Sequence, residues 1–439
     1  MDDLGLLNRS GSIWQRSLSI FQDYYAFGEL KWTHSLYCGI FYKIFADNPN
    51  GFHIFKWSQV IAMFLVYGAL AYQITRRSIA FLLIPAISLS FHYLYDQFFF
   101  LTTQENTGLL FLGLSFLTIT SLQNDRLSSS QKIIWSIIAF LEIILALGAK
   151  ETFFVGILAL GSSCIWWGLN RKTSKRVSLI SGLLLILLGV CYGLFLKLIV
   201  SKGYTSTYSL NNFPAIISNL STWFKKDFLN HLPWIIAAIW LLLKNPTNKK
   251  HCSFTSLERY GLLLGALSYI FFLGILLPWN VTSYYAGPLG IFFALILTII
   301  LSSRIEQLKL PPTILLVSFV CLLNIAVCFY ALHREATYHQ NTQGLWTWIK
   351  NNPDFQDLDR QENVCCNANE ASYAIPQHAN RWWNLNLKPF KYVLSLQLPL
   401  RTDCKMFVSS SRFEKINASD MRTWTEEFHS KFWSVYQRH

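Results

Sequence analysis

The sequence predicts an α-helical polytopic membrane protein with a small external α/β domain at its C-terminus. Three observations support this fold class. Of the 439 residues, 52% are hydrophobic and 14% are charged, whereas soluble proteins carry about 25% charged residues. Long apolar runs recur up to Leu332, and the remaining tail is polar and mixed. Aromatic residues reach 16%, which suits a bundle with many Trp and Tyr anchors at the membrane interface.

A membrane-spanning helix needs about 20 mostly apolar residues, and ten segments approach this pattern. They are Phe55–Ile74, Ile79–Phe98, Thr107–Leu122, Ile133–Leu147, Phe153–Leu169, Val177–Val200, Leu232–Leu243, Tyr260–Leu277, Gly287–Leu301 and Ile314–Leu332. Ser35–Phe45 is too short to span and is interpreted as an interfacial helix. The predicted organisation is an external segment (1–54), a transmembrane bundle (55–332) and an external domain (333–439).

The formal charge of +13 is spread between the apolar runs, which argues against nucleic acid as a partner. One set of alternating loops carries fourteen Lys and Arg residues and the opposite set carries five. The positive-inside rule assigns the first set to the cytoplasm. Residues 1–54 and the C-terminal tail are then non-cytoplasmic. Met1–Lys31 has no apolar signal core, so either a further span precedes it or this polar segment crosses unaided.

The tail has the composition of a small folded domain. It is nearly neutral and rich in both charge signs. A helix end is predicted at Gly344–Asn351, and short strands at Val364–Cys366, Tyr392–Leu396 and Met406–Ser409. In an oxidising compartment one disulfide is expected. Because adjacent cysteines rarely pair, it joins Cys404 to Cys365 or Cys366.

Polar residues in or beside spans are candidates for function because the membrane penalises them. On this topology they gather at the external edge, and they comprise Asp2, Asp3, Asp96, Gln104, Glu105, Lys150, Glu151, Lys202, Tyr284 and Tyr285. Each also has a structural interpretation. Asp2 and Asp3 suit a solvated chain end, Asp96 suits a helix cap, and Lys150 with Glu151 suits an ion pair at a tight turn. Tyr284 and Tyr285 suit an interfacial belt.

Two stretches carry a resemblance to a known family. Lys31-Trp32-Thr33-His34 is followed by Phe45-Ala46-Asp47-Asn48-Pro49-Asn50-Gly51-Phe52-His53. Together they resemble the first external loop of the GT-C glycosyltransferases, especially the branch of protein O-mannosyltransferases and tetratricopeptide-bearing mannosyltransferases. Asp2 and Asp3 are similar to the acidic pair of that family, and Lys150-Glu151-Thr152 is similar to its Lys-Glu-Thr between spans.

The resemblance implies a GT-C-like bundle and a membrane glycosyltransferase of the cell envelope. It would move a sugar from a polyprenyl-phosphate donor to an acceptor hydroxyl at the external membrane face, with inversion. Asp2 or Asp3 would be the catalytic base, with Asp96 as the next candidate. Lys150 or Lys202 would stabilise the phosphate leaving group. Tyr284 and Tyr285 would donate hydrogen bonds, and Gln104, Glu105 and Glu151 would complete the donor site.

Two other classes of protein remain open. A transporter or flippase of lipid-linked sugars would need polar residues at mid-span, where Glu142 and Lys197 are the clearest. A non-catalytic assembly protein would bind partners through its tail and would not depend on Asp2 or Asp3. We expect no cofactor, although Asp96 and Glu105 leave a divalent metal open. The sugar and the acceptor are not specified by the sequence.

Overall fold

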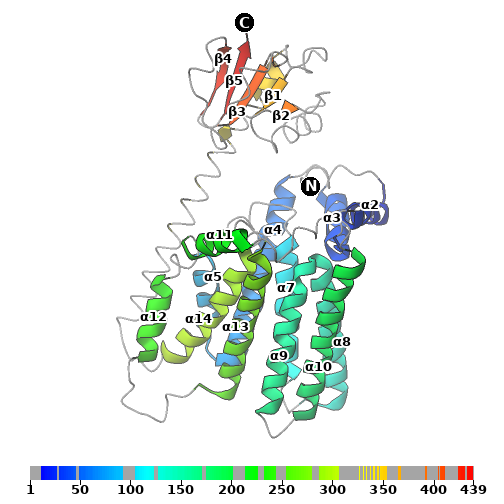
Figure 1. Cartoon of the computed structure of the whole chain (residues 1–439), viewed down its shortest axis with the longest axis vertical. Coiled ribbons are helices and arrows are strands. Elements are labelled where there is room, and N and C mark those ends of the chain that lie inside the picture. Colours follow the sequence, from blue (N-terminus) through cyan, green and yellow to red (C-terminus); the bar gives the residue numbers. More distant parts are fainter. Residues whose placement is uncertain are drawn as a thin grey trace. The chain divides into compact units, whose positions relative to one another are not determined.

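A computed structural model gives the fold of the chain (Figure 1). It describes residues 11–26, 29–45, 49–91, 104–122, 127–170, 175–200, 213–225, 232–243, 254–278 and 286–305, and shorter stretches between 326 and 438. The chain divides into two compact units. One is helical and comprises Arg9–Cys328, and the other contains Phe329–His439.

The helical unit follows the apolar runs of the sequence closely. Its α-helices are α2 (Ile13–Ala26), α3 (Trp32–Phe45), α4 (Pro49–Thr75), α5 (Ala80–Ser88), α7 (Gln104–Leu122), α8 (Ser129–Ala149), α9 (Phe154–Leu169), α10 (Lys175–Phe195), α11 (Phe213–Trp223), α12 (Leu232–Leu243), α13 (Ser256–Leu276) and α14 (Gly287–Ile305). Two short elements adjoin them: η1 (Glu151–Phe153) lies between α8 and α9, and η2 (Leu196–Val200) continues α10. Capping boxes at Ser128 and Thr255 fix where α8 and α13 begin.

Five of the described helices are long and apolar enough to cross a membrane, and they indicate a membrane protein. They are Ile54–Thr75, Ser129–Ala149, Glu151–Leu169, Arg176–Leu198 and Ser256–Leu276. Their outward faces are apolar, as Leu183, Leu184 and Leu187 on α10 illustrate, each about 60% exposed. Such continuous exposed apolar surface suits lipid and not water.

The prediction of ten spans is not confirmed. Within the described part of the chain, α5 and α12 are short, and α14 contributes only a shorter apolar helix, Gly287–Ser303. The expected span Ile314–Leu332 lies almost wholly outside the described residues. α7 has the length of a span, but it carries Glu105, Asn106 and several hydroxyl side chains that face the interior of the bundle. Its polarity reflects burial among other helices.

A group of aromatic rings lies in the largely aliphatic core of the helical unit. Phe292 of α14 contacts the rings of Tyr67, Phe116 and Phe272, with centroid distances of 6.1, 6.1 and 5.3 Å. These side chains come from α4, α7 and α13 and are at most 1% exposed. Offset and edge-on contacts of this kind add to the energy of burial. The four helices are therefore locked together around one ring.

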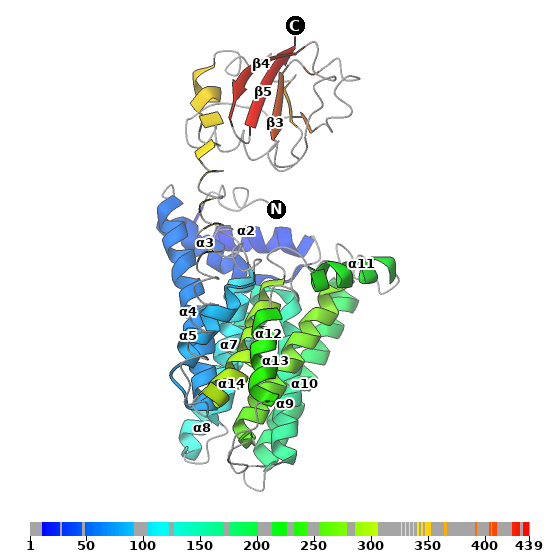
Figure 2. The ribbon, with the colours of Figure 1, turned by 90° about the vertical axis from the view of Figure 1, so that its left-hand side faces the viewer.

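α2 and α3 lie across one end of this bundle (Figures 1 and 2). α3 includes the predicted Ser35–Phe45 helix and begins three residues earlier. α2 was not predicted, because its sequence mixes Gln15, Arg16 and Asp23 with apolar residues. The two helices approach closely at Gly39, where a Cβ atom would overlap the Ser17 hydroxyl.

The other unit contains a five-stranded mixed sheet of order β2-β1-β3-β5-β4. Its strands are β1 (Val364–Cys366), β2 (Lys391–Tyr392), β3 (Met406–Ser410), β4 (Trp424–His429) and β5 (Trp433–Arg438). β1 pairs in parallel with β2 and β3, and β5 pairs antiparallel with β3 and β4. A disulfide joins Cys365 to Cys404, which confirms one of the two predicted pairings.

Candidate functional site

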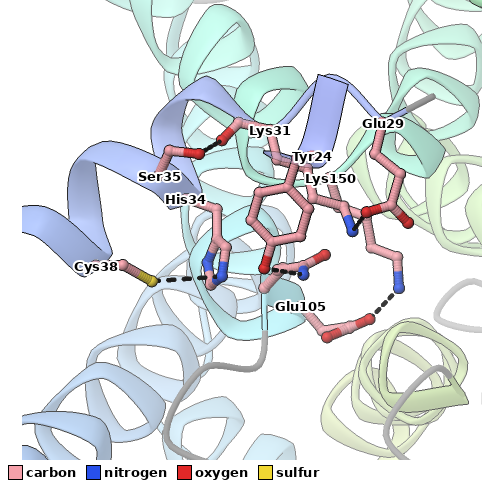
Figure 3. A network of polar contacts seen from close by, with 9 residues as sticks. Tyr24, Glu29, Lys31, His34, Ser35, Cys38, Glu105 and Lys150 are labelled. Carbon is pink, nitrogen blue, oxygen red and sulfur yellow. Dashed lines mark hydrogen bonds and ion pairs between the residues drawn. The ribbon is translucent and has the colours of Figure 1, made fainter. Parts of the chain in front are cut away.

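A group of buried polar side chains gathers where α2 and α3 meet the ends of three longer helices (Figure 3). We call it the polar cluster. Its members are Tyr24, Glu29, Lys31, His34, Lys56, Gln104, Glu105 and Lys150. All but Glu29 and Gln104 are at most 5% exposed. Burying so many ionisable groups costs free energy unless each is paired with an opposite charge or bound to a ligand.

Lys150 enters the cluster because two helices meet there without a loop. α8 ends at Ala149, Lys150 has extended backbone angles (φ −156°, ψ 136°), and η1 follows at once. Its ammonium group forms an ion pair with Glu105, the second residue of α7. The two side chains are 5% and 2% exposed. Removing one partner of such a pair costs about 3–5 kcal/mol, because the other is left as a buried charge.

Lys31 connects the short helices to the bundle. It lies directly before α3, and its ammonium group pairs with Glu29 and lies 4.5 Å from the centre of the Tyr24 ring. The Tyr24 hydroxyl in turn accepts a hydrogen bond of 3.5 Å from Gln104 Nε2 of α7. A cation over an aromatic face is stabilised by the ring quadrupole. Glu29 and Tyr24 therefore hold Lys31 in place, and Gln104 of α7 holds the Tyr24 ring.

His34 lies in the first turn of α3 and is fully buried. Burial lowers its pKa well below the ordinary value, and the charges of Lys31, Lys56 and Lys150 lower the pKa further. These three lysines come from three different segments of the chain, and Lys56, on α4, is itself fully buried. The imidazole is therefore neutral and lies in a region of positive potential.

Several polar atoms in or beside the cluster have no hydrogen-bond partner among the described residues. They are Thr33 Oγ1, His34 Nδ1, Gln59 Oε1, Glu105 Oε2 and Glu151 Oε2. Each belongs to a side chain at most 9% exposed. An unsatisfied buried polar atom costs about 1–3 kcal/mol. Two of these atoms, His34 Nδ1 and Glu105 Oε2, belong to the cluster itself, where a polar ligand would satisfy them.

Gly148 fixes the position of α3 against the bundle. A Cβ atom there would overlap the Trp32 ring and the Thr33 hydroxyl. The Trp32 ring also contacts Tyr192 of α10 at 6.4 Å between centroids. Tight packing at this point sets how far Lys31 and His34 reach toward Lys150.

The structure brings together only part of the predicted site. Gln104, Glu105 and Lys150 lie in the cluster, and Glu151 follows directly along the chain. The expected partner of Lys150 was Glu151, and the ion pair in the structure is with Glu105. The remaining predicted site residues lie outside the described residues, and they are Asp2, Asp3, Asp96, Lys202, Tyr284 and Tyr285.

Five members of the cluster were not predicted as site residues, and one of them, Lys31, entered the sequence analysis only through the resemblance. Tyr24 and Glu29 belong to the region of the unpredicted α2. Lys56 gave a usable signal, since a lysine next to Phe55 and Trp57 in an apolar run is a functional candidate by default. His34 follows Lys31 by three residues, the spacing that puts two side chains on one helix face.

No group of three or more His, Cys, Asp and Glu side chains that could hold a metal ion occurs in the part of the chain that the structure describes. In the polar cluster, Glu29 and Glu105 each form an ion pair with a lysine. Neither a family model, nor a curated protein, nor a solved structure matches this chain. The chemistry of the site therefore has to be argued from its own residues.

Proposed function

We propose that this protein is a membrane glycosyltransferase that moves a sugar from a polyprenyl-phosphate donor to an acceptor hydroxyl. The observation that carries the proposal is the polar cluster itself. Lys31, Gln104 and Lys150 are far apart in the sequence, and Lys31 and Lys150 belong to motifs that resemble the GT-C family. In the structure they are linked through Tyr24, Glu105 and His34 into one buried group.

The position of the cluster suits a lipid-borne substrate. It lies at one end of a bundle whose outer faces are apolar, so a polyprenyl tail would stay in lipid while its phosphate reached the lysines. When the sugar leaves, the bond between the anomeric carbon and the phosphate oxygen breaks and the phosphate gains negative charge. Cationic groups fixed at that point lower the barrier. Lys150, held by Glu105, is the first candidate and Lys31 is the second.

The carboxylate oxygen atoms without a hydrogen-bond partner would bind the sugar of the donor. Glu105 Oε2 and Glu151 Oε2 accept no hydrogen bond from a described residue, and sugar hydroxyls are suitable donors. Asp2 or Asp3 would remove the proton from the acceptor hydroxyl, which then attacks the anomeric carbon with inversion. Asp96 is the alternative base. Lys202, Tyr284 and Tyr285 would add contacts to the donor.

We assign the cluster to the external face of the membrane. α8 has Lys132 in its first turn and Lys150 directly after its last residue. A helix of that length places them about 30 Å apart. α10, which has Arg176 as its second residue, begins at the same end of the bundle as α8, where Lys132 lies. By the positive-inside rule those basic ends are cytoplasmic. The Cys365–Cys404 disulfide supports an oxidising, external location for the C-terminal unit.

A transfer assay tests this function. The purified protein in nanodiscs receives a polyprenyl-phosphate sugar and a panel of hydroxyl acceptors, and both glycosylated product and free polyprenyl phosphate are measured. The change of both Asp2 and Asp3 to Asn should cut turnover roughly a hundredfold and leave donor binding nearly unchanged, since a general base contributes about that factor. Unchanged turnover would exclude both residues as the base, and no transfer by the parent would refute the enzyme.

One observation favours the alternative of a transporter or flippase. Glu142 lies within the candidate span Ser129–Ala149, is half-buried, and forms a hydrogen bond with Thr118 of α7. A carboxyl group inside a span is expensive and commonly marks a transport path. If the parent moved the lipid-linked sugar between leaflets without transfer, and Glu142→Gln abolished that movement, this alternative would replace the enzyme.

A further inference from the structure

His34 is the cluster residue with the most unusual surroundings. It is 0% exposed and is in contact with aromatic rings on two sides, Tyr24 at 5.8 Å and Tyr37 at 5.9 Å between centroids. Its Nε2 atom lies 3.5 Å from the Cys38 sulfur, one turn further along α3. Its Nδ1 atom has no hydrogen-bond partner among the described residues. One side of the ring is therefore satisfied and the other is available.

The charges around the ring decide what it can do. Lys31, Lys56 and Lys150 all act on His34, and each opposes its protonation. An imidazole that resists a proton is a poor general base, so a role in deprotonating the acceptor does not fit. A neutral imidazole still carries one N–H donor. When Nε2 accepts from the Cys38 thiol, that donor is Nδ1–H.

A neutral donor that is exposed to the charges of three lysines suits an anion. The positive potential that disfavours imidazolium favours a negative oxygen at the same place, and a hydrogen bond to a charged acceptor is about twice as strong as a neutral one. Sugar hydroxyls carry no net charge, so the positive potential would stabilise them much less. Among the parts of the proposed donor, the phosphate is the one that carries charge.

We propose that His34 is a ligand of the donor phosphate, with Nδ1–H donating a hydrogen bond to a phosphate oxygen between Lys31, Lys56 and Lys150. This assignment rests on the proposed function, because it takes the phosphate from the polyprenyl-phosphate donor. It adds a residue whose contribution is directional where that of the lysines is mainly electrostatic. The ring fixes the phosphate orientation and thereby the direction in which the anomeric carbon is presented.

Two amide substitutions separate the roles of the ring nitrogens. An Asn side chain places its amide near the position of Nδ1, whereas a Gln side chain places it near Nε2. Binding of polyprenyl phosphate, with no sugar attached, is measured on the full-length protein in nanodiscs for the parent, His34→Asn, His34→Gln and His34→Ala. The control is His429→Ala, which removes an exposed histidine of β4. Thermal unfolding confirms that each variant is folded before binding is compared.

We expect His34→Ala and His34→Gln to weaken binding about tenfold or more, the scale for a lost hydrogen bond to a charged group. His34→Asn should stay within about threefold of the parent, and His429→Ala should match it. If all three His34 variants bound polyprenyl phosphate as tightly as the parent, the assignment would be overturned and the proposed function would stand. If His34→Asn, His34→Gln and His34→Ala all lost the same affinity, the assignment would also be overturned, because an amide at the position of Nδ1 would then not replace the imidazole. No binding by the parent would overturn both proposals.

Discussion

The ion pair between Lys150 and Glu105 should show strong energetic coupling. Its two side chains are 5% and 2% exposed, so each charge depends on the other for compensation. We expect Lys150→Met or Glu105→Gln alone to lower the free energy of unfolding by about 3–5 kcal/mol. The double change removes both charges, and the remaining loss should be about 1–2 kcal/mol, the cost of imperfect packing.

The measurement is a double-mutant cycle of unfolding free energies in one detergent. The coupling energy is the loss in the double variant minus the sum of the losses in the single variants. With the values above, the double variant is more stable than either single variant. Lys132→Met, in the first turn of the same helix, is the matched control and should change stability by less than about 0.5 kcal/mol.

A different result would refute the reasoning. If the losses of the two single variants add up in the double variant, the pair is not a coupled unit. If Lys150→Met alone is nearly neutral, the charge is not buried as the structure describes. In either case the buried ion pair at the centre of the polar cluster would be refuted, and so would the proposal that Glu105 positions Lys150.

Three further predictions follow from local features. Because the pKa of His34 is lowered, unfolding below pH about 6.5 takes up a proton, so parent stability should fall as the pH drops from 6.5 to 5, by up to about 1.4 kcal/mol per pH unit. His34→Asn should remove that part of the pH dependence, and an unchanged slope would contradict the burial. Gly148→Ala should displace α3 because of its overlap with Trp32 and Thr33, and should weaken donor binding more than Gly274→Ala, where a Cβ atom meets nothing within 4 Å. Replacing Cys365 and Cys404 by Ser opens a loop of sequence separation 39 and should destabilise the C-terminal unit by about 4 kcal/mol, as proteolysis of its sheet would report.

The parts of the fold that could be predicted depend on local pattern. Apolar length located the five candidate spans to within a few residues, and the strands at Val364 and Met406 follow β-branched and apolar runs. The hairpin of β4 and β5 was missed. β4 carries Thr425, Glu426 and Glu427 on an exposed edge strand, and such charged residues weaken the strand pattern while they protect the edge.

The site was predictable only where the sequence itself juxtaposes residues. Lys150 and Glu151 are neighbours in the chain, so they were expected to act together, whereas the observed partner Glu105 is 45 residues away. No local pattern specifies such a tertiary pair. α2 left a weak trace, because its buried Ser17, Ile20 and Tyr24 follow helical spacing. That trace is hidden by the polar residues between them.

Sugar release from the donor tests the central claim most directly. With the hydroxyl acceptors of the transfer assay present to take the sugar, the rate at which polyprenyl phosphate is freed from a polyprenyl-phosphate sugar is compared for the parent, Lys150→Ala, Lys150→Arg and Lys132→Ala. If the polar cluster is the site of transfer, Lys150→Ala should lower that rate about a hundredfold or more, Lys150→Arg should retain part of it, and Lys132→Ala should release at the parent rate. A Lys150→Ala variant that is folded and releases polyprenyl phosphate as fast as the parent would contradict the account.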